Sequence, residues 1–424
     1  MNIAVIADDL TGAADSGVQL SRSGYRTAVV FRNAPLSPSE DLDAIAVETD
    51  SRSLKPRLAR ERVLEAGRGL KNAGIVYKKV DSTLRGPVVA EVSAALEATG
   101  RKHAIVAPAF PSTGRTTRDG VQLVHGVPVH KTELSKDPHT PVLESHIPSL
   151  LSEVLPSLTA LSVADLGGLH SVRVVLENAG CIVVDAESEA HLEVLVRAVP
   201  DPSSVLWVGS AGLARALGSV YPGPQANASP RTDPPASSVL SVVGSANEVA
   251  REQLRRLIEE PGVEPIPLDT AALIAGGSSE DAIAEAVMAV RSALLGNRGA
   301  ALYSTAGEEA DAAIRDGPVP EDEVAGLVAD ALASVVAGVS DGGLFDALVM
   351  TGGDTGVRVG RRLGATGILL RGELEPGVPI GTLTGPRPYR VVTKAGGFGG
   401  PETLRDAFRA LTGTGKERTA WTAP

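Results

Sequence analysis

A short apolar run that stops at two glycines and an acid most constrains how this chain can fold. Residues 347–350 are Ala-Leu-Val-Met, enough for a buried strand, and residues 354–363 have a helical pattern that Asp354 or Thr355 would cap. Between them lie Thr351, Gly352 and Gly353. This order is typical of α/β domains, and the N–H groups at such a helix start suit a phosphate. A turn that merely connects strand and helix explains the glycines equally well.

A second glycine cluster favours the phosphate interpretation. The apolar run 391–393 and Lys394 lead into glycines and then to Pro401, a residue favoured at the first position of a helix; the glycines are Gly396, Gly397, Gly399 and Gly400. Lys394 would add a positive charge, and Ser245 follows another strand, 239–243. A dinucleotide fingerprint is missing, because Glu402 stands where its third glycine would be. Residues 412–416 lack the pattern of a phosphate loop and are interpreted as a solvated tail.

The length of 424 residues exceeds what one typical core contains, so we expect more than one domain. Residues 221–238 carry five prolines and almost no large apolar side chain, which indicates a linker. Strands and helices alternate on both sides of it. The sequence therefore predicts an α/β protein of two domains, 1–220 and 239–424, each a largely parallel sheet flanked by helices, with the active site expected in the cleft between them.

Acids, hydroxyls and basic groups follow three expected strands of the N-terminal domain. The strands are 3–7, 44–47 and 75–80, and the polar residues after them include Asp8, Asp9, Arg52, Lys79, Asp81, Ser82 and Arg85. Ligands of open α/β sheets bind at these strand ends. Arginine can clamp a carboxylate, and aspartates can accept hydrogen bonds from hydroxyls or take a proton, so the mixture suits a small polyhydroxylated acid. Taken singly, each basic group is better explained as a surface ion pair, and Asp8 or Asp9 as a helix cap.

Composition excludes several classes of function. A net charge of −11 argues against a general binder of nucleic acid or membrane surfaces. The only cysteine, Cys181, lies in an apolar run, so no disulfide forms within the chain and a reducing compartment is expected. The first residues do not resemble a signal peptide, and no later apolar run is expected to approach the ~18 residues that span a bilayer. We therefore expect a cytoplasmic protein without a membrane partner.

The turn-rich stretch 108–141 is expected to be a functional or flexible loop in which Arg115 and Arg118 reach an anion. Three histidines in and after it match no metal-ligand spacing, and turn or surface roles are favoured for them; they are His130, His139 and His146.

The chain resembles the four-carbon acid sugar kinases over nearly its whole length. Six segments carry the resemblance, in order: Ile6-Ala-Asp-Asp-Leu-Thr-Gly12, Asp50-Ser-Arg52, Lys78-Lys-Val-Asp-Ser-Thr-Leu-Arg-Gly86, Pro108-Ala-Phe-Pro-Ser-Thr-Gly-Arg115, Thr351-Gly-Gly-Asp-Thr355 and Lys394-Ala-Gly-Gly-Phe-Gly399. The family pairs an N-terminal sugar-acid-binding domain with a C-terminal nucleotide-binding domain.

The resemblance implies ATP-dependent phosphorylation of the terminal hydroxyl of a tetronate such as threonate, erythronate or a 3-oxo-tetronate, with Mg²⁺ bridging the phosphates. Asp9, Arg52 and residues 79–82 would touch the sugar acid. Ser245, residues 352–355 and a glycine of 396–399 would touch ATP. Many members have glutamate where this chain has Asp354. For the catalytic aspartate the prediction is Asp81, with Asp9 second.

Two other functions remain open from the residues alone. A sensor would bind the sugar acid and ATP without turnover, and a nicotinamide-dependent oxidoreductase would act on a hydroxy acid, although the missing fingerprint counts against it. The sequence shows no heptad repeat or apolar stripe that defines an interface, so a homo-oligomer is compatible with it but not indicated.

Overall fold

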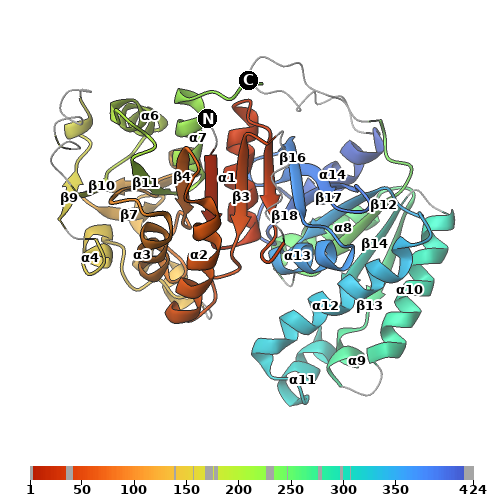
Figure 1. Ribbon diagram of the computed structural model, residues 1–424. Coiled ribbons are helices and arrows are strands. Elements are labelled where there is room, and N and C mark those ends of the chain that lie inside the picture. Colours follow the sequence, from red (N-terminus) through yellow and green to blue (C-terminus); the bar gives the residue numbers. More distant parts are fainter. Residues whose placement is uncertain are drawn as a thin grey trace. The chain divides into compact units, whose positions relative to one another are not determined.

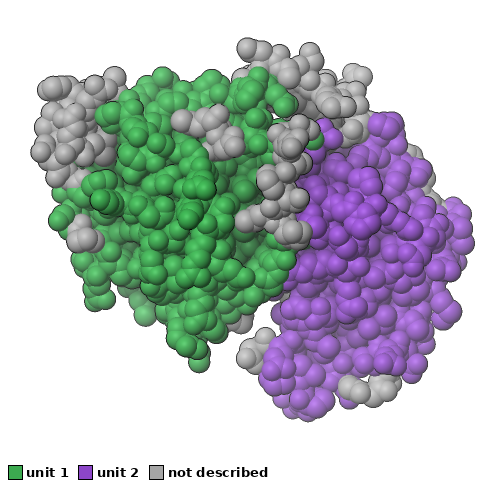
Figure 2. Space-filling model, viewed as in Figure 1, with its two compact units in different colours: residues 1–229, 423–424 green, residues 230–422 purple. Residues whose placement is uncertain are grey.

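The structure is a computed structural model that divides into two compact units, residues 1–229 with 423–424, and residues 230–422 (Figures 1 and 2). It describes residues 3–34, 42–137, 140–155, 157–167, 175, 180–225, 234–245, 247–275, 279–296, 299–305 and 307–414. The boundary at 229/230 falls within the proline-rich stretch.

Among the described residues, the main strands of unit 1 pair in parallel in the order β2-β3-β1-β4-β11-β5-β10-β9. Its strands are β1 (Ile3–Ala7), β2 (Thr27–Val30), β3 (Ala44–Glu48), β4 (Ile75–Lys79), β5 (His103–Ala107), β9 (Leu158–Leu161), β10 (Cys181–Val184) and β11 (Val205–Gly209). The chain fills one side of β1 with β2 and β3 and then crosses to β4 on the other side. The three strands β3, β1 and β4 therefore end side by side at this reversal of strand order, which is where α/β sheets bind ligands.

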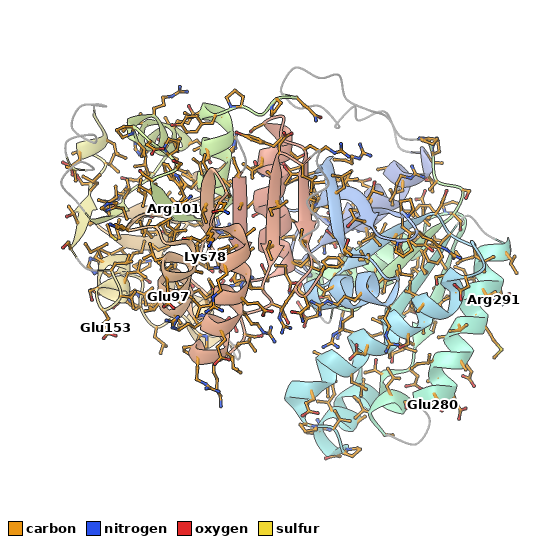
Figure 3. The ribbon with its side chains drawn as sticks, in the orientation of Figure 1. Lys78, Glu97, Arg101, Glu153, Glu280 and Arg291 are labelled. Atoms are coloured by element: carbon orange, nitrogen blue, oxygen red, sulfur yellow. The ribbon has the colours of Figure 1, made fainter. Side chains whose placement is uncertain are left out.

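Helices cover both faces of this sheet because successive strand residues point to opposite sides. They are α1 (Leu10–Arg22), α2 (Pro56–Leu70), α3 (Val88–Thr99), α4 (Ile147–Leu151), α6 (Glu189–Ala198) and α7 (Ala211–Val220). Helix α2 packs against α3, and α1 packs against α7. The core on the α2–α3 side includes Ile6, Val63 and Val92, each with no exposed surface. In Figure 3, Lys78 lies inside this unit, whereas Glu153 lies at its periphery.

The stretch 108–141 is more ordered than the sequence predicts. It forms a small antiparallel sheet of β6 (Arg115–Arg118), β7 (Val121–Val124) and β8 (Val127–Pro128), so the interpretation as a structureless loop was wrong. The buried carboxylate of Asp185 accepts hydrogen bonds from the N–H groups of Asp119 and Gly120 and so holds the tight turn between β6 and β7. Short strands joined by two-residue turns leave little hydrophobic periodicity in the sequence.

The strands described in unit 2 pair in the order β13-β14-β12-β15-β18-β17-β16. Its strands are β12 (Val239–Val243), β13 (Val263–Leu268), β14 (Gly299–Ser304), β15 (Ala347–Thr351), β16 (Gly367–Glu373), β17 (Pro379–Thr384) and β18 (Arg390–Lys394). The first five strands of that order pair in parallel, and β16 and β17 add an antiparallel edge. The expected largely parallel sheet is therefore present in both units.

The helices of unit 2 are α8 (Glu248–Ile258), α9 (Thr270–Ile274), α10 (Ser279–Gly296), α11 (Glu308–Asp316), α12 (Glu321–Ser340), α13 (Gly353–Arg362) and α14 (Thr403–Thr412). Two predicted helix starts were wrong. Helix α13 begins at Gly353 with Gly352 as its cap, not at Asp354 or Thr355, and α14 begins two residues after Pro401. The carbonyl of Gly352 already accepts the hydrogen bond from Gly356, which starts the helix early.

Helix α12 corrects the expectation that no apolar run reaches membrane-spanning length. The window Glu323–Ser340 has 18 residues with a mean hydropathy of 1.6, and half of it is buried in the structure. Because α12 packs against α10 and α13, we interpret it as a core helix, which passes the same test of length and composition.

Candidate active site

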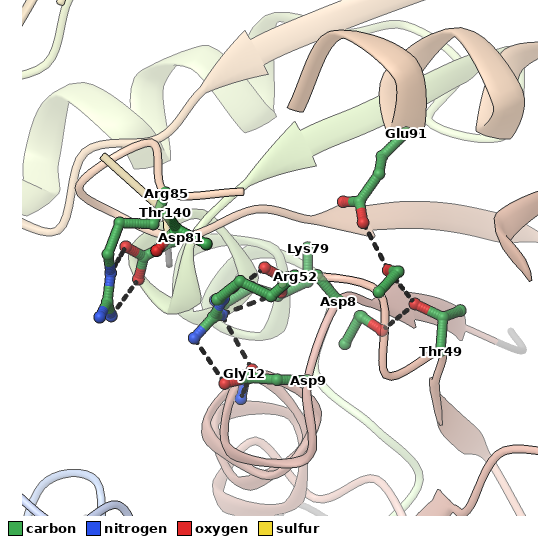
Figure 4. A network of polar contacts seen from close by, with 12 residues as sticks. Asp8, Asp9, Gly12, Thr49, Arg52, Lys79, Asp81, Arg85, Glu91 and Thr140 are labelled. Atoms are coloured by element: carbon green, nitrogen blue, oxygen red, sulfur yellow. Dashed lines mark hydrogen bonds and ion pairs between the residues drawn. The ribbon is translucent and has the colours of Figure 1, made fainter. Parts of the chain in front are cut away.

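Asp8, Asp9 and Arg52 form one connected cluster at the ends of β1 and β3 (Figure 4). Asp8 follows β1 directly, and Asp9 caps α1 by accepting a hydrogen bond of 2.7 Å from the Gly12 N–H. Arg52 donates to Asp8 through Nε (2.6 Å) and Nη2 (3.0 Å), and to Asp9 through Nη1 (2.5 Å) and Nη2 (2.9 Å). These contacts leave Arg52 a single N–H for a ligand, so it cannot clamp a carboxylate bidentately while both aspartates hold it.

Asp81 and Arg85 form a second pair just after β4. Arg85 Nε lies 2.8 Å from Asp81 Oδ2, and the Thr83 hydroxyl donates to the same oxygen. The Ser82 carbonyl accepts a hydrogen bond of 2.6 Å from Gln122 Nε2 on β7, so the small sheet is anchored to this loop. Asp81 is 9% exposed and keeps its carboxylate at the edge of the buried interior.

Lys79 is a cation of this region that forms no ion pair with a carboxylate of the described residues. It is the last residue of β4 and only 4% exposed, and its ammonium forms no ion pair or hydrogen bond within the described part of the chain. Its ammonium lies close to the start of α1, because a Cβ added at Gly12 would be 3.0 Å from Lys79 Nζ. Lys79 is therefore placed to bind an anion beside the helix N-terminus.

The carboxyls of this region differ in acidity. Burial opposes ionisation of Asp8 and Asp81, but the positive charge of Arg52 and of nearby basic groups outweighs it and lowers the pKa of both carboxyls. For Asp9, burial prevails over the attraction of Arg52, and the negative charge of Asp8 adds to it, so the pKa of Asp9 is raised. The pKa of one aspartate in this region is thus shifted in the opposite direction to the pKa values of the other two, as in sites where one carboxyl moves a proton and another stays ionised.

The residues Lys78 and Glu91 lie beneath this cluster, and we did not identify them from the sequence. Lys78 Nζ lies 2.9 Å from Glu91 Oε2, and both side chains are almost fully buried. The sequence contains a signal for this pair: a lysine lies inside the apolar strand 75–79, and an acid lies in the apolar start of α3. Because buried charges occur in pairs, the two could have been predicted to contact each other.

In unit 2, three parallel strands that are neighbours in the sheet end at the predicted glycine turns. These strands are β12, β15 and β18. Gly352 has φ +101° and ψ 122°, a backbone conformation that side chains disfavour. A Cβ added at Gly396 would lie 2.1 Å from Ser245 Oγ, and one added at Gly244 would lie 2.2 Å from Thr355 Oγ1. The glycines thus let three turns and the hydroxyls of Ser245 and Thr355 meet in one place.

The other predicted residues of unit 2 lie around this meeting point. Gly353 is the first residue of α13, and Asp354, in its first turn, is exposed. A Cβ added at Gly397 would be 3.5 Å from Asn247 Nδ2, whereas Gly399 (φ +83°) faces Thr403 and Glu375. Gln253 of α8 donates to the carbonyls of Phe398 (3.0 Å) and Gly400 (2.8 Å) and so fixes the glycine segment, a role not predicted from sequence.

Lys394 ends β18 beside these turns and is 3% exposed. Its ammonium donates to Thr351 Oγ1 (3.1 Å) and to the Gly396 carbonyl (3.0 Å), both uncharged oxygens. Burial lowers the pKa of Lys394 to about 8, although the charge of Glu375 opposes the shift. A polyphosphate at the glycine turns would supply the negative charge that Lys394 lacks.

Other basic and metal-ligating candidates are occupied locally. Arg115 donates to the Thr113 carbonyl, and Arg118 pairs with Glu187. His130 and His146 bond to serine hydroxyls, and His139 lies outside the described residues. Within the described ranges no group of three or more His, Cys, Asp and Glu side chains could hold a metal ion.

Comparison with known proteins matches each unit to a family model. The model described as a sugar-binding N-terminal domain covers residues 3–217, and the one described as a nucleotide-binding C-terminal domain covers residues 240–404. A D-threonate kinase of Salmonella typhimurium is 35% identical over 96% of this chain and 98% of its own. The chain belongs to the four-carbon acid sugar kinase family. It is accordingly a phosphotransferase with an alcohol group as acceptor, and its C-terminal unit is a nucleotide-binding domain.

Other members of the four-carbon acid sugar kinase family carry different substrate names. A D-erythronate kinase of Heliobacterium modesticaldum is 32% identical over 93% of both chains, and a 3-oxo-tetronate kinase of Methylobacterium radiotolerans is 28% identical over 94% of this chain and 96% of its own. The fold matches a crystal structure of a Haemophilus influenzae protein of the DUF1537 family with a TM-score of 0.75 at 25% identity, over 96% of this chain and 100% of the other.

Proposed function

We propose that this kinase transfers the γ-phosphoryl group of ATP to the terminal hydroxyl of a tetronate, in the cytoplasm and with Mg²⁺. The observation that carries the proposal is the unpaired Lys79 beside the Asp8–Asp9–Arg52 cluster, at the switch point of a domain that matches a sugar-binding family. One free cation suits one carboxylate, and the surrounding aspartates suit hydroxyls.

The tetronate carboxylate would pair with Lys79 at the start of α1, with the remaining N–H of Arg52 as a second donor. This differs from the sequence-based prediction that Arg52 clamps the carboxylate, because the two aspartates engage its other donors. Ser82 and Arg85, which follow β4 on the same loop as Asp81, are proposed to contact the rest of the sugar acid.

For the catalytic base the acidity of the carboxyls favours Asp9 over Asp81. A base works best when its pKa lies near the working pH, and the pKa of Asp9 is raised whereas that of Asp81 is lowered. Asp9 would take the proton of the attacking hydroxyl. Asp81, which stays ionised, would orient the sugar acid by accepting a hydrogen bond from one of its other hydroxyls.

ATP is proposed to bind at the glycine turns of unit 2, where its phosphates would meet the N–H groups of residues 352–355, the Ser245 hydroxyl and the segment 396–399. The close approach of Gly396 to Ser245 fits a backbone that cradles phosphate. Mg²⁺ bound to nucleotide phosphates needs only one or two protein carboxylates, and the exposed Asp354 stands at the right turn to supply one. The metal would neutralise charge on the transferred phosphoryl group.

D-Threonate is the first substrate to test, because D-threonate kinases of Salmonella typhimurium and Bordetella bronchiseptica are 35% and 36% identical to this chain. The experiment measures ADP release with Mg²⁺ and ATP across both enantiomers of threonate and erythronate and the 3-oxo-tetronates, with ³¹P NMR of the product. We expect turnover on one tetronate and a phosphate on its terminal oxygen. Tetronate binding without ADP release would refute the proposal and favour the sensor.

A further inference from the structure

We propose that Glu91, a buried residue with no assigned role, is a positioning residue. It holds the segment 49–52 after β3, which we call the Arg52 loop, against the end of β4, and so sets the affinity of the site for the tetronate. This inference rests on the proposed function. Glu91 lies in the first turn of α3 and is 1% exposed. Its two carboxylate oxygens bind two different segments. One accepts from Ser51, and the other pairs with Lys78.

The Ser51 contact fixes the segment that carries Arg52. Ser51 donates its hydroxyl hydrogen to Glu91, its hydroxyl oxygen lies 2.7 Å from Thr49 Oγ1, and its N–H donates to the Asp8 carbonyl at 2.8 Å. The preceding residue, Asp50, has a left-handed φ of 50°. A non-glycine residue in this conformation persists only where its surroundings hold it. Through its hydrogen bond with Ser51, Glu91 helps to hold the turn that positions Arg52.

The Lys78 contact fixes the end of β4. Besides pairing with Glu91, Lys78 Nζ donates to the Lys79 carbonyl at 2.7 Å. Side chains of Lys78 and Lys79 point to opposite faces of the sheet, so Lys78 controls the backbone of Lys79 from the α3 side while the Lys79 ammonium faces α1. Glu91 thus links, through Ser51 and Lys78, the two segments that supply both proposed carboxylate donors.

The charged nature of this link has a physical reason. A buried ion pair adds little net stability compared with well-packed apolar residues, because desolvation of the charges offsets their attraction. Directional hydrogen bonds that a hydroxyl and an ammonium donate to one carboxylate instead set the relative positions of the two segments. Displacement of a binding group by about 1 Å is enough to cost on the order of 10²-fold in activity.

The test compares Glu91→Gln with Tyr77→Phe, a control on β4 that loses a buried hydrogen bond to the Ser210 carbonyl but does not touch the Arg52 loop. Calorimetry measures the Kd of the tetronate and of a non-hydrolysable ATP analogue, and steady-state assays measure both KM values. For Glu91→Gln we expect tetronate Kd and KM to rise by about tenfold or more while both nucleotide values stay within about twofold. For Tyr77→Phe all four values should stay near wild type despite lower thermal stability.

A folded Glu91→Gln protein with wild-type tetronate affinity would overturn the proposal. So would an equal loss of affinity in Tyr77→Phe, because it would show that any destabilisation of unit 1 has this effect. If Glu91→Gln does not fold, Ser51→Ala removes the same link without leaving Lys78 unpaired, and wild-type affinity in that variant would equally overturn it. Because affinity is measured apart from turnover, a wild-type protein that binds the tetronate without phosphorylating it would refute the kinase proposal and still test Glu91.

Discussion

At the scale of single residues, the arginines of the candidate site are paired with carboxylates, whereas two lysines are not. Arg52 is held by two aspartates and Arg85 by one, whereas Lys79 and Lys394 have no carboxylate partner among the described residues. These two lysines end β4 in unit 1 and β18 in unit 2. An anionic ligand bound to each unit would therefore pair with the lysine of that unit.

Lys394 yields a prediction about proton uptake. Because its pKa in the free protein is about 8, a fraction of the protein is deprotonated at this position in mildly alkaline solution. Bound ATP favours the charged ammonium and raises its pKa, so binding at about pH 8.5 should take up protons. Calorimetry of nucleotide binding in two buffers of different ionisation enthalpy measures this uptake. We expect different heats for the wild type and equal heats for Lys394→Met; equal heats for the wild type would contradict the assignment.

At the scale of elements, the turns at strand ends were predictable because their signals are local. Glycines after β15 and β18 and acids after β1 can be recognised in the sequence without knowing the fold, and the strand 239–243 has the predicted bounds. The pairing of Lys78 with Glu91 was not predicted, because these residues are joined only by the packing of α3 on the sheet. The start of α13 was missed for a similar reason: the Gly352 N–H donates to the Lys394 carbonyl, a contact that depends on the neighbouring strand.

The glycine turn after β15 gives a prediction that separates binding from stability. Gly352→Ala places a side chain at φ +101°, where its Cβ would also lie 3.3 Å from Thr355 Oγ1. We expect the nucleotide Kd to rise by about tenfold, since a shifted turn no longer presents its N–H groups to phosphate. Gly343→Ala is the matched control, because that glycine also has a positive φ, 61°, but a Cβ there meets nothing within 4 Å. Equal effects of the two substitutions on nucleotide affinity would contradict the placement of the phosphates.

At the scale of the whole molecule, the chain divides its chemistry between two α/β units, each with ligand candidates at the carboxyl ends of parallel strands. The α/β class and the division into two units followed from the sequence because they depend on periodicity and on glycines between strands and helices, whereas the location of the two ligand sites stays a prediction. The acidity of each carboxyl and the partners of Arg52 did not, because both depend on distances of a few ångströms. The net charge of −11 makes these local cations necessary for any anionic ligand.

The most direct measurement of the central claim is ADP release with Mg²⁺, ATP and the accepted tetronate by the wild type, Asp9→Asn and Asp81→Asn. Asparagine still caps a helix, so Asp9→Asn should fold with α1 intact. The account predicts that it loses kcat by about 10²- to 10⁴-fold with the KM for ATP unchanged, the usual loss on removal of a general base. Asp81→Asn should mainly raise the KM for the tetronate. Turnover by Asp9→Asn within about twofold of the wild type would contradict the account.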